Sequence, residues 1–130
     1  MNFLTLPQIE NTIGIFGSGF SVSKLKNALW LADKEIFYWG DIDTHGFQIL
    51  SQIRGYFSNT KSIMMDFETL NTFKEDWDKG KPTTAASLSH LTADEKKLFN
   101  FVKADNIRLE QEKISQEYVL KQVAKIYETA

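Results

Sequence analysis

Three short β-prone apolar segments, at residues 12–16, 35–39 and 62–65, constrain the fold of this chain more than any other feature. The stretches between them place apolar residues three and four positions apart, which is the spacing of an amphipathic helix. The order is therefore strand, helix, strand, helix, strand. Strands joined by helical crossovers form a parallel sheet with right-handed connections, so the sequence predicts an α/β domain.

Each predicted helix presents one apolar face. For the two helices between the strands, these faces are Val22, Leu25, Leu29 and Ala32, and then Phe47, Leu50, Ile53 and Phe57. For three helices in the second half of the chain, they are Leu70, Phe73 and Trp77, then Leu98, Phe101 and Val102, then Leu120, Val123 and Tyr127. Thr92 and Glu95 form a capping box, and residues 78–90 are turn-rich. We expect a single domain over residues 1–130, with its core at about 1–77 and a helical C-terminal extension at about 92–130.

Composition narrows the class of protein. A chain of 130 residues suits one small domain, and a net charge of −2 gives no general attraction to DNA or anionic membranes. Any contact with nucleic acid must therefore come from a local patch. The absence of cysteine excludes disulfides and thiolate metal sites. No apolar run approaches the roughly 20 residues that span a bilayer, and the N-terminus lacks a signal-peptide pattern, so we expect a cytoplasmic protein without a membrane partner.

Two aspartates follow the second predicted strand directly. Asp41 and Asp43 are two residues apart on an extended chain, so their side chains point to the same side and could share one ion. Mg²⁺ suits such a pair, because it typically takes one or two carboxylates, several waters and phosphate oxygens. Gly40 and Gly46 would let a phosphate approach closely. An aspartate is also a good helix N-cap, so the residues alone leave both interpretations open.

Three further features of this region have two interpretations each. Gly17 and Gly19 bracket Ser18 after the first strand, either as a tight turn or as a phosphate contact. His45 lies at a helix start, where a surface residue is commoner than a ligand. The third predicted strand ends at Asp66, at the same rim if the strands are parallel. The D-x-D spacing does not fit haloacid-dehalogenase-type phosphatases, whose threonine comes one residue later, or response-regulator receivers, which need an earlier acidic pair.

These motifs together resemble a known family. "FGSGF" before "GDIDTHG" is similar to the Toprim domain of topoisomerases, primases and related nucleases. More narrowly, "YWGDIDTHGFQIL", "SIMMDFETL" and "RLEQE" resemble the C-terminal domain of JetD, the nuclease subunit of the Wadjet anti-plasmid system. The resemblance runs from about Asn2 to the last helix. It implies a Toprim-like, Rossmann-like parallel sheet flanked by helices.

The resemblance also implies an activity: cleavage of double-stranded DNA with Mg²⁺ or Mn²⁺, beside condensin-like Wadjet subunits. Asp41 and Asp43 would be the catalytic metal ligands. The resemblance implies two further groups of site residues: those that contact DNA or phosphate, and those that match the family's sequence signature. They are Gly17, Gly19, His45 and Arg108 for DNA or phosphate, and Asp66, Glu110 and Glu112 with Arg108 in the family signature.

One element of the family pattern is expected to be missing. A Toprim site has a glutamate at the end of its first strand, and by resemblance that glutamate would precede Met1. Glu10 is the substitute within the chain, but it lies too close to Gly17 for an intervening helix or turn. We therefore expect a domain without the family's first strand, with weak or no cleavage. The exposed sheet edge would be hidden by self-association or by the N-terminal segment folding back.

Two alternatives to this function stay open: a non-catalytic remnant or interaction module with the same fold, and a Toprim-like nucleic-acid-processing enzyme outside Wadjet. A structural alternative concerns Arg108 and Glu112, which are four residues apart and could form an ordinary ion pair on a helix. The hypothesis is that Arg108 or Glu110 reaches the Asp41 and Asp43 rim instead.

Overall fold

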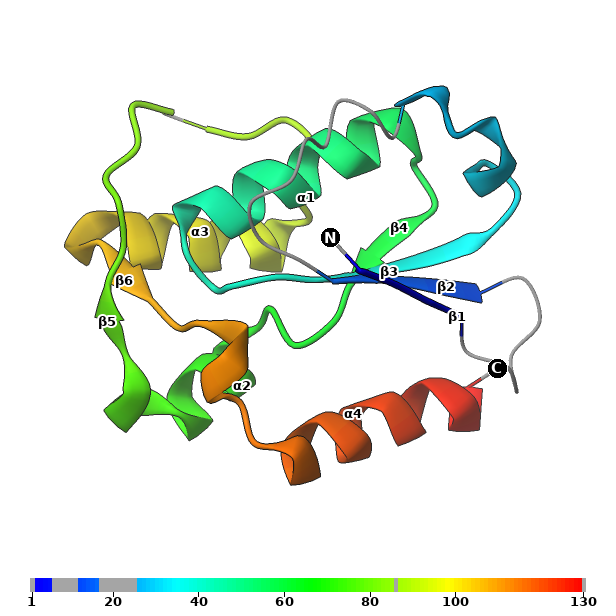
Figure 1. Ribbon diagram of the computed structural model, residues 1–130. Helices are drawn as coiled ribbons and strands as arrows, with labels where there is room; N and C mark the ends of the chain where they lie inside the picture. The colour runs from blue at the N-terminus through cyan, green and yellow to red at the C-terminus, as the bar shows by residue number, and fades with distance from the viewer. Residues whose placement is uncertain (1, 6–11, 17–25, 86, 130) are drawn as a thin grey trace.

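The computed structural model describes residues 2–5, 12–16, 26–85 and 87–129 (Figure 1). Its main sheet has the strand order β1-β2-β3-β4. The strands are β1 (Asn2–Thr5), β2 (Thr12–Phe16), β3 (Glu35–Trp39) and β4 (Thr60–Ser62). β2, β3 and β4 are parallel, whereas β1 is antiparallel to β2. The predicted α/β fold with a parallel sheet is confirmed.

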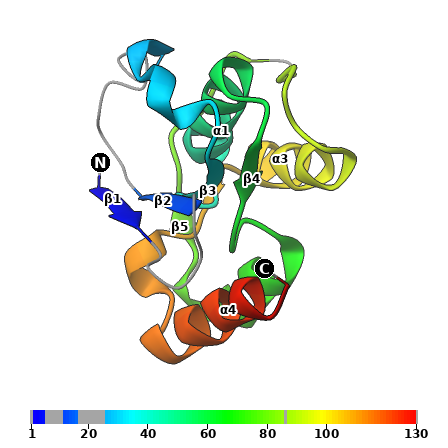
Figure 2. The same cartoon turned by 90° about the vertical axis from the view of Figure 1, so that its right-hand side faces the viewer.

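Helices flank this sheet on both sides. The α-helices are α1 (Thr44–Tyr56), α2 (Phe67–Thr72), α3 (Ala93–Asp105) and α4 (Gln116–Thr129). Short 3₁₀ turns add η2 (Leu29–Leu31), η3 (Lys74–Asp76) and η4 (Gln111–Lys113). α1 lies on one side of the sheet and the C-terminal helix α4 on the other (Figures 1 and 2). No helix in the described ranges is both long and apolar enough to cross a membrane.

The core includes an apolar layer on one face of the sheet. Ile13 and Ile15 of β2 stand in register with Ile36 and Tyr38 of β3, and all four are buried. Alternate strand residues share a face, so these side chains form one apolar layer. α1 contributes the predicted face to the same core cluster: Phe47, Leu50 and Ile53, followed by Phe57 just after the helix.

Several predicted details of these elements are wrong. The third strand is Thr60–Ser62 rather than residues 62–65, and Met64 has a left-handed φ of 57°, which ends strand geometry. Within residues 26–34, short 3₁₀ turns that include η2 replace the expected first helix. Leu31 is buried there, whereas the predicted inward residue Leu29 is 76% exposed. Val22 and Leu25 lie outside the described residues.

Two helix faces differ from the prediction by a small rotation. In α3, Phe99 is buried and Phe101 is 37% exposed, although the Thr92 and Glu95 capping box forms as predicted. In α4, Leu120 is 61% exposed, while Tyr118 and Val119 pack against the core. Neighbouring elements choose which of several apolar residues turns inward, so helical spacing alone could not select them.

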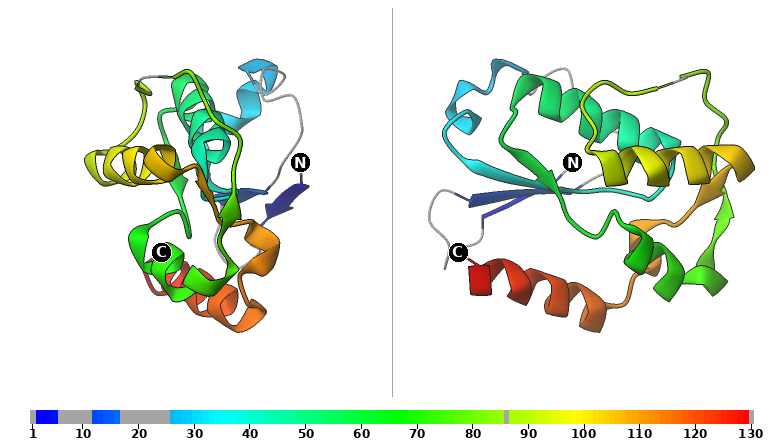
Figure 3. Two further views of the ribbon diagram at one scale, coloured as in Figure 1. Left: turned by 90° about the vertical axis from the view of Figure 1, so that its left-hand side faces the viewer. Right: turned by 180° about the vertical axis from the view of Figure 1, so that it is seen from behind.

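The sequence "RLEQE" at residues 108–112, here called the C-terminal signature, does not begin as a helix. β5 (Asp78–Lys79) and β6 (Ile107–Arg108) form a separate two-stranded antiparallel sheet. Figure 3 shows this ribbon beside α2 and α3, at one end of the main sheet. In the main sheet, β1 is an edge strand. It pairs with β2 along its whole length, from Asn2 with Phe16 to Thr5 with Ile13. The N-terminal segment therefore covers the edge of β2, which is one of the two expected ways to hide it.

Candidate metal centre

Asp43 is the N-cap of α1. The backbone N–H of Gly46 donates to Asp43 Oδ1 over 2.6 Å, and the residue is 7% exposed. The helix-capping interpretation of the D-x-D pair is therefore correct for Asp43. The cap uses one carboxylate oxygen and leaves the second without a hydrogen bond among the described residues.

Asp41 is held by the C-terminal signature. The backbone N–H of Gln111 donates to Asp41 Oδ1 over 2.8 Å. Between the two aspartates, Ile42 exchanges both backbone hydrogen bonds with Leu109, at 2.9 and 3.0 Å. Residues 109–111 therefore run antiparallel beside residues 40–43, which are here called the D-x-D loop. The signature lies at the predicted rim, although backbone groups rather than the Arg108 side chain make the direct contacts.

Arg108 belongs to a surface ion-pair cluster next to this loop. Its guanidinium donates to both carboxylate oxygens of Asp78, at 2.8 and 3.1 Å, and pairs with Glu110 at 3.0 Å. The helical Arg108–Glu112 pair is excluded because Arg108 ends β6 and Glu112 lies in η4. The side-chain hydrogen bond with Arg108 lowers the pKa of Asp78. Sequence reasoning missed Asp78, because nothing local to it signals a partner 30 residues away.

Gly40 and Gly46 lie so close to other atoms of the protein that a side chain would not fit at either position. A Cβ on Gly46 would overlap the backbone carbonyl of Asp41, so only glycine lets the first turn of α1 lie against the loop. A Cβ on Gly40 would overlap the hydroxyl of Tyr38. That these glycines also let a phosphate approach closely stays a prediction. They allow the loop, the helix start and Tyr38 to pack together.

The two carboxylates carry poorly compensated charge. Burial raises the pKa of Asp41, the hydrogen bond from Gln111 only partly offsets this, and the charge of Asp43 raises the pKa further. Burial likewise raises the pKa of Asp43, against the opposing effects of the Gly46 hydrogen bond and then of His45 and Arg108. Both carboxylates therefore remain harder to ionise than a free aspartate. A cation beside them would remove that penalty.

The remaining predicted residues lie elsewhere or outside the description. His45 is exposed in the first turn of α1. Asp66 is the N-cap of α2, where its Oδ1 accepts from Thr69 N–H at 2.8 Å. Glu10, Gly17 and Gly19 lie outside the described residues.

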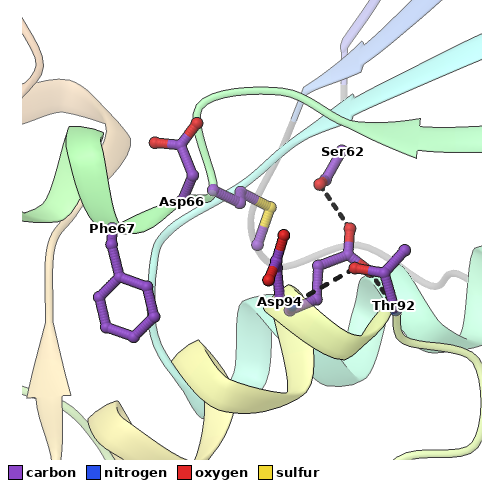
Figure 4. A pocket seen from close by; sticks show the side chains of 7 residues that line it. Ser62, Asp66, Phe67, Thr92 and Asp94 are labelled. Carbon is purple, nitrogen blue, oxygen red and sulfur yellow. Dashed lines mark hydrogen bonds between the residues drawn. The ribbon is translucent and has the colours of Figure 1, made fainter.

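Asp66 also lines a pocket distinct from the D-x-D loop, of about 320 Å³ (Figure 4). The lining residues come from the end of β4, the start of α2 and the start of α3: Ser62, Met65, Asp66, Phe67, Thr92, Asp94 and Glu95. None of the residues at the D-x-D loop lines it.

The D-x-D loop fits a hard divalent cation. Asp41 and Asp43 each keep one carboxylate oxygen free of hydrogen bonds within the described ranges, and oxygen is the ligand type that Mg²⁺ prefers. Two residues that adjoin this loop each bury a polar atom with no hydrogen-bond partner among the described residues: the Tyr38 hydroxyl and the Gln111 side-chain oxygen. In the parts of the chain that the structure describes, no three His, Asp or Glu side chains gather as a complete protein cage. Mg²⁺ needs no such cage, because it keeps several waters.

Comparison with known proteins assigns the family. A protein-family model described as "Wadjet protein JetD, C-terminal" matches residues 1–123. No curated protein matches the chain. The family match spans the sheet, the D-x-D loop, the C-terminal signature and most of α4. The chain therefore belongs to the family of the C-terminal domain of the Wadjet protein JetD.

Proposed function

We propose that the D-x-D loop binds Mg²⁺ or Mn²⁺ through Asp41 and Asp43, and that this domain cleaves DNA phosphodiesters as part of Wadjet plasmid defence. One observation carries the proposal. The two carboxylates share a loop, Asp43 is buried and Asp41 is half-buried, and burial raises both pKa values despite one backbone hydrogen bond to each. A bound divalent ion would supply charge neutralisation at the scissile phosphate and a polarised water.

Around that site, the chain's own residues hold the geometry. Gly46 N–H fixes Asp43, and Gln111 N–H fixes Asp41, so the two carboxylates are oriented before any ligand arrives. His45 is exposed at the start of α1, where a helix N-terminus favours an anion. The Asp78 carboxylate holds the Arg108 guanidinium beside the loop. We assign His45 and Arg108 to contacts with DNA phosphates.

The activity of this domain alone is proposed to be weak. The Toprim pattern calls for a third acidic residue as general acid–base group, and such assistance is worth about 10²–10⁴-fold in rate. The loop itself supplies Asp41 and Asp43, and the charges of Glu112 and Glu110 also act on Asp41, but no three acidic side chains among the described residues gather as a metal site. We therefore propose that strong cleavage of double-stranded DNA needs additional protein surface, with the condensin-like Wadjet subunits as partners. An interaction module that keeps the loop without cleaving is the second candidate.

Metal titration tests the binding half of the proposal. Calorimetry with Mn²⁺ should give measurable heats for the wild type and none above background for Asp41→Asn or Asp43→Asn. Asp66→Asn is a matched control, because Asp66 is also a helix N-cap with one backbone hydrogen bond and asparagine preserves capping. Equal heats from all four proteins would overturn the metal assignment.

Plasmid nicking tests the activity half. With Mg²⁺ or Mn²⁺, the wild type should nick slowly at most, and Asp41→Asn should not nick at all. Efficient cleavage that vanishes in Asp41→Asn would show that the domain is catalytically complete. Glu10→Gln would then identify whether Glu10 supplies the missing carboxylate.

A further inference from the structure

Tyr38 carries a buried hydroxyl that the core does not need. The residue lies in β3, is 0% exposed, and its hydroxyl has no hydrogen-bond partner among the residues that the structure describes. A buried hydroxyl that has lost water without gaining a partner destabilises the folded protein. Phenylalanine would fill the same apolar space without that penalty. Core packing therefore does not explain why this position carries a hydroxyl.

The hydroxyl is directed toward the D-x-D loop. It lies against Gly40, the residue immediately before Asp41, at the position that a Cβ would occupy. The negative charges of Asp41 and Asp43 act on the phenol as well as burial does. A neutral phenol is a hydrogen-bond donor, and carboxylates and water oxygens are acceptors.

Gln111, which lies beside the same loop, supplies a second unpartnered atom. Its backbone N–H donates to Asp41, whereas its side-chain oxygen is buried and has no hydrogen-bond partner in the described part of the chain. An amide oxygen is an acceptor only. An unpartnered donor on Tyr38 and an unpartnered acceptor on Gln111 thus come from two residues that adjoin the D-x-D loop. A water molecule, which both donates and accepts, can satisfy both kinds of group, and a hydrated cation carries several waters.

We propose that Tyr38 and Gln111 are positioning residues that orient the water shell of a divalent cation held by Asp41 and Asp43. This rests on the proposed metal function and adds two members to the site that donate to or accept from its waters. Partners of this kind keep metal ligands and waters in a fixed orientation, and removing them typically weakens metal affinity about 10–100-fold. Tyr38 and Gln111 touch no substrate in this assignment.

Removing the phenol hydroxyl separates this role from a structural one. Tyr38→Phe should weaken Mn²⁺ binding about 10-fold by calorimetry. Without metal, its thermal midpoint should be unchanged or higher than that of the wild type, since it removes an unpartnered buried group. Tyr118→Phe is the matched control, because the Tyr118 hydroxyl already shares a 2.8 Å hydrogen bond with Thr69. The control should lose metal-free stability and keep the wild-type affinity for Mn²⁺.

Gln111→Leu tests the second residue independently and carries the test alone if Tyr38→Phe does not fold. It should bind Mn²⁺ about 10-fold more weakly, because it keeps the backbone N–H to Asp41 and loses only the amide. If the wild type binds Mn²⁺ through Asp41 and both variants match its affinity, the positioning role is overturned and the metal site stands. If the wild type binds no Mn²⁺, the proposed function itself has failed.

Discussion

Two regions of the molecule hold carboxylates away from water: the start of α3, with Glu95, and the D-x-D loop, with Asp41 and Asp43. They differ in how many hydrogen bonds and ion pairs compensate the negative charge. Glu95 of α3 receives two hydrogen bonds from Arg54 of α1, at 2.5 and 3.1 Å, and one from Ser62 at 2.6 Å. Thr92 N–H donates to it over 2.8 Å. Within the described ranges, Asp41 and Asp43 each receive one backbone hydrogen bond and no ion pair.

The pKa values show the consequence of this difference. Burial alone would raise the pKa of Glu95, but the bonds from Arg54, Ser62 and Thr92 outweigh it and the pKa is lowered. The same burial leaves the pKa of Asp41 and Asp43 raised. A lowered pKa contributes stability that is lost as pH falls through it, whereas a raised pKa contributes stability that is lost as pH rises through it. The Glu95 cluster thus stabilises the fold at neutral pH, and the D-x-D loop works against it.

Breaking the Glu95 cluster should have the largest effect. Arg54→Met would leave Glu95 buried without its cation, and removing one partner of a buried pair typically costs about 3–5 kcal/mol of unfolding free energy. Urea denaturation measures it. The control is Lys61→Met in the exposed Lys61–Glu35 pair, where a change of only about 0–1 kcal/mol is expected. Similar small losses in both variants would show that water already screens Glu95.

Crowding the D-x-D loop should have the next largest effect. Gly46→Ala places a methyl against the Asp41 carbonyl, and overpacking of this kind typically destabilises by about 1–3 kcal/mol. It should also abolish Mn²⁺ binding because the loop must shift. Gly55→Ala, in the last turn of the same helix, meets only the exposed His90 side chain and should be neutral or stabilising. Equal stability and full metal binding in Gly46→Ala would contradict the packing reason for this glycine.

Neutralising the loop should stabilise the metal-free protein, which is the opposite of what Arg54→Met does. Asp41→Asn keeps an oxygen acceptor for Gln111 N–H and removes a charge that burial penalises, so a gain of about 0.5–2 kcal/mol is expected near pH 7. Because the pKa of Asp41 is raised, the gain should grow as pH rises through it and vanish in acid, where wild-type Asp41 is protonated. Thermal unfolding at pH 3 and pH 7 measures both values. A pH-independent difference would mean that the Asp41 charge is not the cause.

The smallest effect is expected at the surface pair beside the loop. Arg108 and Asp78 are both substantially exposed, so Asp78→Asn should change the unfolding free energy by only about 0.2–1 kcal/mol. It should also free the Arg108 guanidinium to offset the charge of Asp43. The gain in unfolding free energy from Asp41→Asn should then be smaller, because Asp43 repels Asp41 less. A double-mutant cycle in low salt measures this coupling. Strict additivity would show that Arg108 does not sense the D-x-D charge.

Local patterns in the sequence were enough to predict much of the fold. β2, β3, α1 and the α3 capping box depend on consecutive residues, whose periodicity and caps are readable without their neighbours. The errors concern choices among equally apolar residues. Phe101 and Leu120 had the right spacing, but packing against other elements turned Phe99 and Val119 inward instead.

The candidate site divides in the same way. The sequence by itself determined that β3 runs into Asp41, Asp43 and Gly46, because strand, loop and helix cap follow one another along the chain. Only the tertiary structure decided which carboxylates stay uncompensated. Gln111 reaches Asp41 from 70 residues away, and Arg54 reaches Glu95 from 41 residues away. Burial and pairing set the cost of a charge, and both depend on contacts between distant segments that no local pattern records.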